Sequence, residues 1–441
     1  MNSKPLEGFR VVDLCVVWAG PFATLQLADL GAEVIKAENP HVWQPMTRGG
    51  AARPPAPLLA AQPAWAGGYP DSDPGDRPWD YSPTFVSLFR NKKSFTVDLR
   101  KPEGMDVLGR LVAVSDVVYE NNATGTLEKL GITYEWLRRT NPTIIYVRVP
   151  AYGSTGPYFD ARALGVHLEG VMGHSLLRGY EDADPSSNTS IFSGDYMAGC
   201  QGAFAVMAAL WHREKTGEGQ LIEIGQAENA SAMFTQAIMD YSLNGRVQTT
   251  IGNRDLDGRH PSGVYPCLSA GTAEECLDRW IAISVETDAQ WESLVAIMGS
   301  PDWAQDPRFG TNGGRLAAHK ELDQLIASFT RDKDDYELMH AFQAAGVAAA
   351  PVLEVSRSFD DPQFKARGFY RPLTQPSSGT YQYSGPMWNL PETPVEFTQA
   401  PAMFGEHNDY VYSEVLGMSS SEIATLKAAG HIATVFDEDI P

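Results

Sequence analysis

The short run Ser193-Gly194-Asp195 is the part of the sequence whose residue types and position most directly suggest chemistry. It directly precedes the N-terminal end of a long predicted helix, 196–215. An aspartate there can simply cap the helix, because its carboxylate satisfies free backbone N–H groups and stabilises the helix by about 1 kcal/mol. It could instead be a carboxylate nucleophile, kept ionised by the helix dipole and flanked by a glycine that lets substrate approach. The residues alone leave both interpretations open.

Other familiar catalytic patterns are missing from the sequence. The nine histidines form no HExxH motif and no Cys/His group has zinc spacing, so no metal is expected. Glycine spacing fails the dinucleotide fingerprint at Ala19-Gly20-Pro21, and neither GxxxxGK[ST] nor GxSxG occurs. We therefore expect no redox enzyme and no permanently bound cofactor. The turn could still place a helix N-terminus beside an anionic ligand.

A polar stretch at 163–179 precedes the aspartate and offers side chains that could touch a substrate. It contains His167, Glu169, His174 and Arg178. Such groups near an active-site aspartate could bind an acyl carboxylate or an aromatic ring. His167 could equally be a hydrogen-bonded core residue.

The first 150 residues predict the framework that positions these side chains. Expected strands alternate with helices, and this alternation predicts an α/β fold with a doubly wound parallel sheet. The strands are expected at 9–14, 32–36, 95–99, 116–120 and 143–149, with helices at 22–30 and 102–114. Residues 39–84 have no periodicity and are rich in Pro, Gly, Ala and Trp, as in lids or binding segments.

The remaining sequence predicts a second, smaller unit. A strand at 219–225 and a helix at 226–243 are followed by a polar linker at 245–265. A strand at 279–285 then precedes helices near 288–298, 319–330 and 335–345, and the Pro-rich stretch 350–404 predicts extended connections. We therefore predict a large domain over 1–225, a linker helix with a small α+β domain over 226–345, and a return to the large domain over 346–441.

Composition narrows the possible partners. The chain has 34 Lys plus Arg against 55 Asp plus Glu, a formal charge of −21. Nucleic acids and anionic membranes need a concentrated basic face, so we expect neither as a partner. Cys15, Cys200, Cys267 and Cys276 are scattered and predicted to be buried, and with no apolar leader or spanning run the expected location is cytoplasmic.

Short motifs occur in a set order along essentially the whole chain, and together they are far more specific than any one alone. They are Val11-Val12-Asp13-Leu14, Val17-Trp18-Ala19-Gly20-Pro21, Ala28-Asp29-Leu30-Gly31-Ala32-Glu33, Asn91-Lys92-Lys93-Ser94, Asp116-Val117-Val118-Tyr119-Glu120-Asn121, Tyr152-Gly153-Ser154-Thr155-Gly156-Pro157, Lys215-Thr216-Gly217-Glu218-Gly219-Gln220 and Gly405-Glu406-His407-Asn408-Asp409. The ordered set resembles the class III coenzyme A transferases, the formyl-CoA and carnitine-CoA transferase group, which also includes α-methylacyl-CoA racemases.

The resemblance implies a reaction. In that family an aspartate at the position of Asp195 attacks the acyl-CoA thioester, giving an aspartyl anhydride and free CoA thiolate. The thiolate returns to form an aspartyl-CoA thioester, and an acceptor carboxylic acid then takes the CoA. Acyl-CoA and a carboxylic acid are therefore the expected partners, and coenzyme A is a substrate rather than a resident cofactor.

The resemblance also implies a CoA-binding set. Basic residues in this set would meet the phosphates as point charges on an otherwise acidic body. The matching residues are Val17, Trp18, Ala19, Arg48, Asn91, Lys92, Lys93, Asn121, Asn122 and Lys129.

Three further expectations follow from the family. Its members fold as a large doubly wound domain and a small domain, and two chains interlock as rings, which implies a homodimer. An α-methylacyl-CoA racemase is an alternative function, although its usual Gly-His-Asp segment is missing and His167 would have to replace it. A subunit of a heteromeric transferase, paired with a paralogous chain, is another.

Overall fold

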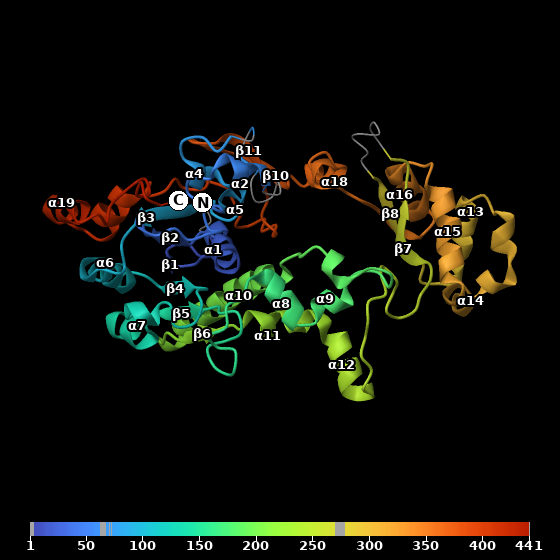
Figure 1. The fold of residues 1–441 in the computed structure, drawn as a ribbon, viewed down its shortest axis with the longest axis horizontal. Helices are drawn as coiled ribbons and strands as arrows, with labels where there is room; N and C mark the ends of the chain where they lie inside the picture. Colours follow the sequence, from blue (N-terminus) through green and yellow to red (C-terminus); the bar gives the residue numbers. More distant parts are fainter. Residues whose placement is uncertain (1–3, 62–67, 70, 72, 270–277, 441) are drawn as a thin grey trace. The chain divides into compact units, whose positions relative to one another are not determined.

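The computed structural model describes residues 4–61, 68–69, 71, 73–269 and 278–440. The chain divides into two compact units (Figure 1). Unit 1 contains residues 1–174, 189–245 and 368–441, and unit 2 contains 175–188 and 246–367. The short excursion 175–188 into unit 2 was not among the sequence predictions.

A six-stranded parallel sheet forms the centre of unit 1, which confirms the predicted α/β class. The strand order is β3-β2-β1-β4-β5-β6, and every neighbouring pair is parallel. The strands are β1 (Arg10–Asp13), β2 (Glu33–Glu38), β3 (Lys92–Thr96), β4 (Val117–Glu120), β5 (Ile145–Arg148) and β6 (Leu221–Glu223). β3 begins at Lys92, three residues earlier than predicted, so the basic pair Lys92-Lys93 lies in a strand rather than in a loop.

Helices cover both faces of this sheet because alternate strand residues point to opposite sides. Val11 packs in one apolar cluster with α1 (Ala19–Asp29) and α10 (Ser193–Thr216). Val12, the next residue, packs in a second cluster with α6 (Pro102–Ala113), α7 (Tyr134–Thr140) and α19 (Ser420–Ala428). The sheet is therefore doubly wound.

The other elements of unit 1 are short. Those in or after the predicted aperiodic stretch are α2 (Ala56–Ala61), α4 (Pro78–Tyr81) and α5 (Pro83–Val86). Those between β4 and residue 245 are η2 (Glu128–Leu130), α8 (Gly165–Val171), α11 (Gln226–Ser231), η4 (Ala232–Phe234) and α12 (Thr235–Asn244). The short helix α9 (His174–Leu177) begins at the last residue of the first segment of unit 1 and continues into the unit 2 segment 175–188. The C-terminal return contains a hairpin of β10 (Tyr370–Gln375) and β11 (Gly379–Ser384), within the stretch 350–404 for which the sequence predicted only extended connections. The π-helix η7 (Tyr410–Val415) follows that stretch.

Unit 2 is an antiparallel three-stranded sheet with helices. β7 (Ser262–Pro266) pairs with β8 (Trp280–Ser284), which pairs with β9 (Ala348–Val352), so the predicted linker 245–265 ends in a strand. The unit also contains η3 (Pro185–Ser187), α13 (Asp288–Ile297), η5 (Asp302–Gln305), η6 (Pro307–Gly310), α14 (Asn312–Ala317), α15 (His319–Thr330), α16 (Asp335–Ala344), α17 (Val355–Ser358) and α18 (Pro362–Ala366).

Two further features are the hydropathy of the helices and the burial of the cysteines. Among the described residues, no helix combines the length and the apolar character needed to cross a membrane. Cys15 and Cys267 are buried as predicted, but Cys200 is exposed. The prediction for Cys276 concerns a position outside the described residues.

Candidate active site

The crevice where the strand order reverses provides the frame of the site. β2 lies on one side of β1 and β4 on the other, so the connections from β1 and β4 leave the sheet in opposite directions. In open α/β sheets, ligands bind at this point, outside the carboxyl ends of the strands. Asn121, just after β4, closes the base of the crevice, since its side-chain amide accepts the Val16 N–H at 2.8 Å and donates to the Val16 carbonyl at 2.8 Å.

The turn between β1 and α1 presents the residues predicted to meet CoA. Val17 adopts a left-handed conformation with φ 60° and donates its N–H to Thr47 Oγ1 at 3.0 Å. Trp18 follows at the N-cap of α1, and Ala19 is the first residue of that helix. Asn122 braces the turn from β4, because its Nδ2 donates to the Leu14 carbonyl at 3.1 Å. Four of the predicted residues, with Asn121 beside them, therefore surround one helix N-terminus.

Close packing of α10 on α1 brings the catalytic candidate to this crevice. A methyl group on Gly199 would stand 2.7 Å from Phe22 Cδ1 and 3.0 Å from the Ala19 carbonyl oxygen, so only glycine allows this approach. One turn earlier, the ring of Tyr196 packs edge-on against Phe22 with centroids 4.8 Å apart. The N-terminal ends of α1 and α10 therefore lie together in unit 1.

Asp195 is not the cap of its helix. α10 begins at Ser193 with Phe192 in the N-cap position, which makes Asp195 the third helical residue. The capping role belongs to Glu169 of α8, whose Oε1 accepts the N–H groups of Ile191 and Ser193, each at 3.2 Å. Of the two interpretations of the Ser193-Gly194-Asp195 run, capping by Asp195 is wrong.

The Asp195 carboxylate lies in a poorly solvated place. Only 8% of the residue is exposed, and Oδ2 is buried without a hydrogen-bond partner among the described residues. Burial, with a smaller contribution from the negative charge of Glu169, raises the pKa of Asp195 from 3.8 to about 7. The sequence predicted that the helix dipole would keep this group ionised, but desolvation outweighs the dipole. A desolvated carboxylate is a stronger nucleophile than a hydrated one, so the environment suits covalent chemistry.

The glycine that makes room for this carboxylate is Gly165, at the start of α8. A methyl group there would lie within 3.0 Å of both Asp195 Oδ2 and Phe192 Cδ1. Gly194, the glycine singled out in the sequence, is buried instead against Leu168 and Ala230. A methyl group added to Gly194 would lie 3.6 Å from Leu168 and 3.8 Å from Ala230, which is ordinary contact. Sequence proximity pointed to Gly194, whereas the tertiary fold supplies Gly165.

The predicted polar residues before α10 have separate roles. His167 Nδ1 accepts the Leu164 N–H at 3.1 Å and so closes the first turn of α8. His174 is buried, its ring lies 4.6 Å from that of Phe234, and its Nδ1 is 3.5 Å from Ser193 Oγ. Arg178 belongs to unit 2, where its carbonyl oxygen accepts Asn188 Nδ2 at 2.9 Å. Of this group, His174 and Glu169 therefore both contact the first residue of α10.

Two of the predicted phosphate-binding cations are buried structural groups. Arg48 is 3% exposed and donates to Glu38 at 2.6 and 2.8 Å and to Asp80 at 3.1 Å. Lys92 is 1% exposed, and its ammonium donates to Asp13 at 3.3 Å and to the Pro21 carbonyl at 2.7 Å. Carboxylate and carbonyl oxygens of the protein thus accept the hydrogen bonds that these two cations were predicted to donate to the CoA phosphates.

The other predicted polar residues are distributed over two edges of the sheet. Asn91 and Lys93 stand at the amino end of β3, where Asn91 Nδ2 donates to Asp29 at 2.8 Å and the Lys93 ammonium lies 4.6 Å from the Tyr410 ring centre. Lys129 lies in η2, after β4, and is exposed. Of the predicted cations, Lys129 is the one on the carboxyl side that faces solvent.

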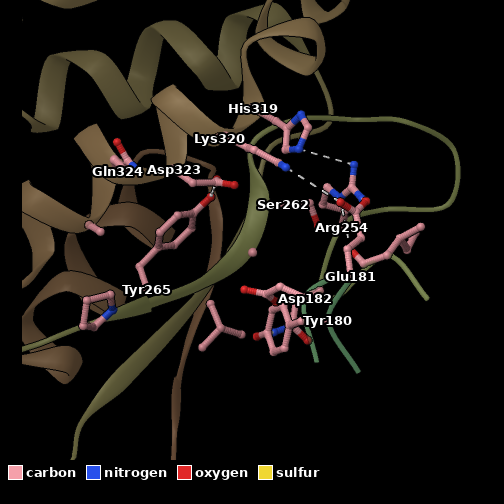
Figure 2. A pocket seen from close by; sticks show the side chains of 16 residues that line it. Tyr180, Glu181, Asp182, Arg254, Ser262, Tyr265, His319, Lys320, Asp323 and Gln324 are labelled. Atoms are coloured by element: carbon pink, nitrogen blue, oxygen red, sulfur yellow. Dashed lines mark hydrogen bonds and ion pairs between the residues drawn. The ribbon is translucent and has the colours of Figure 1, made fainter. Parts of the chain in front are cut away.

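Unit 2 contains a separate cavity of about 480 Å³. Figure 2 shows Glu181 turned toward both Arg254 and Lys320, with which it forms ion pairs. On another wall, the Tyr265 hydroxyl donates to Asp323 at 2.8 Å. Most charged groups of the cavity therefore satisfy one another. Within the described residues, no group of three or more His, Cys, Asp or Glu side chains is arranged to hold a metal ion.

A doubly wound sheet, a helix N-terminus at its switch point and a desolvated carboxylate on the neighbouring helix α10 are together typical of an α/β enzyme. The comparisons with known proteins specify which one. The chain belongs to CoA-transferase family III, whose profile matches residues 6–408. It is therefore a transferase enzyme, and the family resemblance drawn from the sequence is confirmed.

Relatives with assigned activities cover almost the whole chain. It is 34% identical to a succinyl-CoA–D-citramalate CoA-transferase from Chloroflexus aurantiacus, over 96% of this chain and 97% of the relative. It is 32% identical to the alpha subunit of a succinyl-CoA–L-malate CoA-transferase from the same species, over 97% and 92%. The crystal structure of a CAIB/BAIF family protein from Brucella suis superposes with a TM-score of 0.79 at 29% identity, covering 94% of this chain and 100% of that one.

Proposed function

We propose that the protein moves CoA from an acyl-CoA donor to a carboxylic acid acceptor through covalent intermediates on Asp195. The observation that carries the proposal is the position of this carboxylate. It is desolvated and lies in the first turn of α10, whose N-cap residue Phe192 packs its ring against Trp18 of the turn at the switch point of the sheet. The names of the relatives support the substrate classes, since they describe transfer between succinyl-CoA and organic acids.

Every intermediate is an anhydride or a thioester, so the free energy of the thioester bond is retained through the cycle. An Asp195 carboxylate oxygen attacks the thioester carbon, the C–S bond breaks, and an aspartyl–acyl anhydride and CoA thiolate result. The thiolate attacks the aspartyl carbonyl, releases the first acid and leaves an aspartyl-CoA thioester. The acceptor carboxylate attacks this thioester and gives a second anhydride, from which the returning thiolate takes the new acyl group and restores Asp195.

Ionisation of Asp195 sets the starting condition of the cycle. Because its pKa is about 7, roughly half of the molecules carry the nucleophilic form at neutral pH. Among the described residues, Oδ2 has no hydrogen-bond partner whose loss would have to precede attack. Glu169 positions the nucleophile indirectly, since it holds the backbone that leads into α10.

For CoA, we propose a binding set at the carboxyl edge of the sheet. The Val17–Ala19 turn would meet the nucleotide, Asn121 and Asn122 hold that turn in shape, and Lys129 would supply charge to a phosphate. Arg48 and Lys92 would stabilise the framework around this binding set through their buried ion pairs, without contacting CoA themselves. His174 remains a candidate for contact with the acyl group.

A homodimer, of the interlocked kind that the resemblance implies, is also proposed. Large apolar side chains stand exposed along the outer face of α10 and along α12, which is typical of a surface covered by another chain. They are Phe204 (65% exposed), Trp211 (63%), Ile238 (49%), Tyr241 (62%) and Leu243 (72%). Because one relative is an alpha subunit, a paralogous chain is the alternative occupant.

A CoA-exchange assay tests the function. Purified protein is incubated with succinyl-CoA and a panel of acids, and new CoA thioesters are identified by mass spectrometry. We expect exchange with the native protein and none with Asp195→Ala, while CoA affinity measured by calorimetry stays within a few-fold of native. Exchange by the alanine variant would refute the role of Asp195, and loss of the Cα hydrogen to deuterated solvent without an acceptor would support a racemase.

A further inference from the structure

Two buried lysines hold the turn between β1 and α1, and one of them, Lys36, was not among the predicted site residues. Lys36 of β2 is 2% exposed and Lys92 of β3 is 1% exposed. Their ammonium nitrogens lie 3.8 and 3.3 Å from the buried Asp13 carboxylate at the end of β1. Lys36 also donates to the Cys15 carbonyl at 2.5 Å, and Lys92 donates to the Pro21 carbonyl at 2.7 Å. The two lysines therefore hold both ends of the turn proposed to bind CoA.

The hydrogen bonds of this cluster require Lys92 to be charged. Its Nζ has three acceptors, which are Asp13 Oδ2, the Pro21 carbonyl and, at 2.8 Å, Thr24 Oγ1. The Thr24 hydroxyl donates its own proton to Asp13 Oδ2 at 2.6 Å, so it accepts from Lys92. A neutral amine has two N–H groups and an ammonium has three, so three acceptors fit the ammonium. Asp13, Thr24, Lys36 and Lys92 thus form one buried network, the turn-holding network, and a buried network whose members are satisfied is rigid.

The turn needs this support because Val17 has an unfavourable backbone conformation. Its φ of 60° is in the left-handed region, which a β-branched residue rarely adopts. Such a residue persists only where its surroundings fix it, and such positions cluster at functional sites. Thr47 accepts the Val17 N–H, and Asn121 bonds both backbone groups of Val16, so side chains fix the middle of the turn. The turn-holding network fixes its two ends.

We propose that Lys36 is a positioning residue for CoA recognition, which together with Lys92 keeps the Val17 turn in its strained conformation without touching the ligand. This inference rests on the proposed CoA site. If the Cys15 carbonyl loses its donor, Val17 can relax, and the apparent affinity for CoA falls by the fraction of molecules that keep the binding conformation. We expect Lys36→Met to weaken CoA binding about ten-fold. At saturating succinyl-CoA, kcat should stay within about two-fold of native, because Asp195 is outside the network.

The first test compares two buried cations that contact opposite ends of α1. Arg90 is 4% exposed and donates to both carboxylate oxygens of Asp29, the last residue of that helix. CoA affinity and Tm are measured by calorimetry for the native protein, Lys36→Met and Arg90→Met. Both variants should melt lower than the native protein, but Arg90→Met should bind CoA within about two-fold of native. A loss of affinity in both variants alike would overturn the proposal, because it would reflect general destabilisation.

A double-mutant comparison tests whether Lys36 acts through the strained turn. Glycine adopts positive φ without strain, so a turn with Val17→Gly no longer needs to be held against relaxation of a valine. Lys36→Met should therefore weaken CoA binding about three-fold or less when it is added to Val17→Gly, compared with about ten-fold in the native chain. An equal loss in both backgrounds would overturn the proposed route.

Thr24 provides a second pair of variants that removes no charge. Thr24→Val keeps the shape of the side chain but loses the hydroxyl that joins Lys92 to Asp13, so CoA binding should weaken several-fold. Thr24→Ser restores the hydroxyl and should bind CoA within about two-fold of native. If Lys36→Met does not fold, this pair decides the question.

Failure of this proposal is distinguishable from failure of the proposed function. Native CoA affinity in both Lys36→Met and Thr24→Val overturns the positioning role, while CoA transfer by the native protein leaves the proposed function intact. If the native protein neither binds CoA nor transfers it, both fail.

Discussion

Replacing Asp195 with asparagine removes the ionisation of this side chain while almost preserving its shape. In the native protein, burial raises the pKa of Asp195 from 3.8 to about 7. The unfolded chain therefore loses this proton at lower pH than the folded chain, and native stability falls as pH rises from about 4 to about 7. Above pH 7 both states are ionised and the penalty is constant. An asparagine carries no such penalty.

The size of the effect follows from the two pKa values. Each pKa unit corresponds to about 1.4 kcal/mol, so the full penalty on the folded state is about 4 kcal/mol above pH 8. At pH 5 only the unfolded state is largely ionised, and the penalty is about 1.5 kcal/mol. With an unfolding entropy of about 2.1 cal/mol/K per residue over roughly 300 residues of unit 1, the difference of about 2.5 kcal/mol corresponds to about 4 °C in Tm.

The assay is differential scanning calorimetry of both proteins, at one protein concentration and without ligand. We expect the Tm of Asp195→Asn to exceed that of the native protein at pH 8.5. At pH 5 this difference in Tm should be smaller by about 4 °C. Every other ionisable group is common to the two proteins, so the comparison isolates the contribution of Asp195. A difference in Tm that does not change with pH would refute the claim that ionisation of the buried Asp195 carboxylate destabilises the folded protein.

The remaining predictions test neighbouring parts of the account. Gly165→Ala should lower the transfer rate at least a hundred-fold, because its methyl group collides with the Asp195 carboxylate. Gly194→Ala should retain the transfer activity and be at least as stable as the native protein. Equal losses of activity in the two variants would contradict this geometry. Lys92→Met should cost about 2 kcal/mol of unfolding free energy in urea titrations, since it removes one of the two buried ammonium groups, with that of Lys36, that pair with the Asp13 carboxylate. Lys129→Met should instead leave stability unchanged and weaken CoA binding several-fold by calorimetry. The rate of Asp195 acylation should rise with pH and level off above about 7, and a flat profile from pH 5 to 9 would count against a buried nucleophile.

Sequence periodicity was sufficient to predict the main framework. Alternating apolar strands and helices to residue 150 predicted the parallel sheet, and the structure has these strands within a few residues of the expected places. The hairpin β10–β11 was missed because its strand β11 is mostly exposed and polar, and proline interrupts β10, so neither shows the usual pattern. The excursion 175–188 into unit 2 leaves no periodic signal at all.

The sequence could single out Asp195 as the candidate nucleophile, but it could not predict the surroundings of that residue. Asp195 was found from its place before a long helix and from ordered motifs. The sequence could not show that Gly165 rather than Gly194 makes room for it, because that depends on how α8 packs beside α10. For the same reason Lys92, which looks like a surface cation in the sequence, is a buried partner of Asp13. Long-range packing decides both cases.

Trapping the covalent intermediate tests the central claim most directly. The native protein is mixed with succinyl-CoA and hydroxylamine, digested, and sequenced by mass spectrometry, with Asp195→Ala and a sample without acyl-CoA as controls. We predict a hydroxamate on Asp195 that forms only when acyl-CoA is present. Active CoA transfer without that modification, or with a hydroxamate on another carboxylate, would contradict the assignment of Asp195 as the nucleophile.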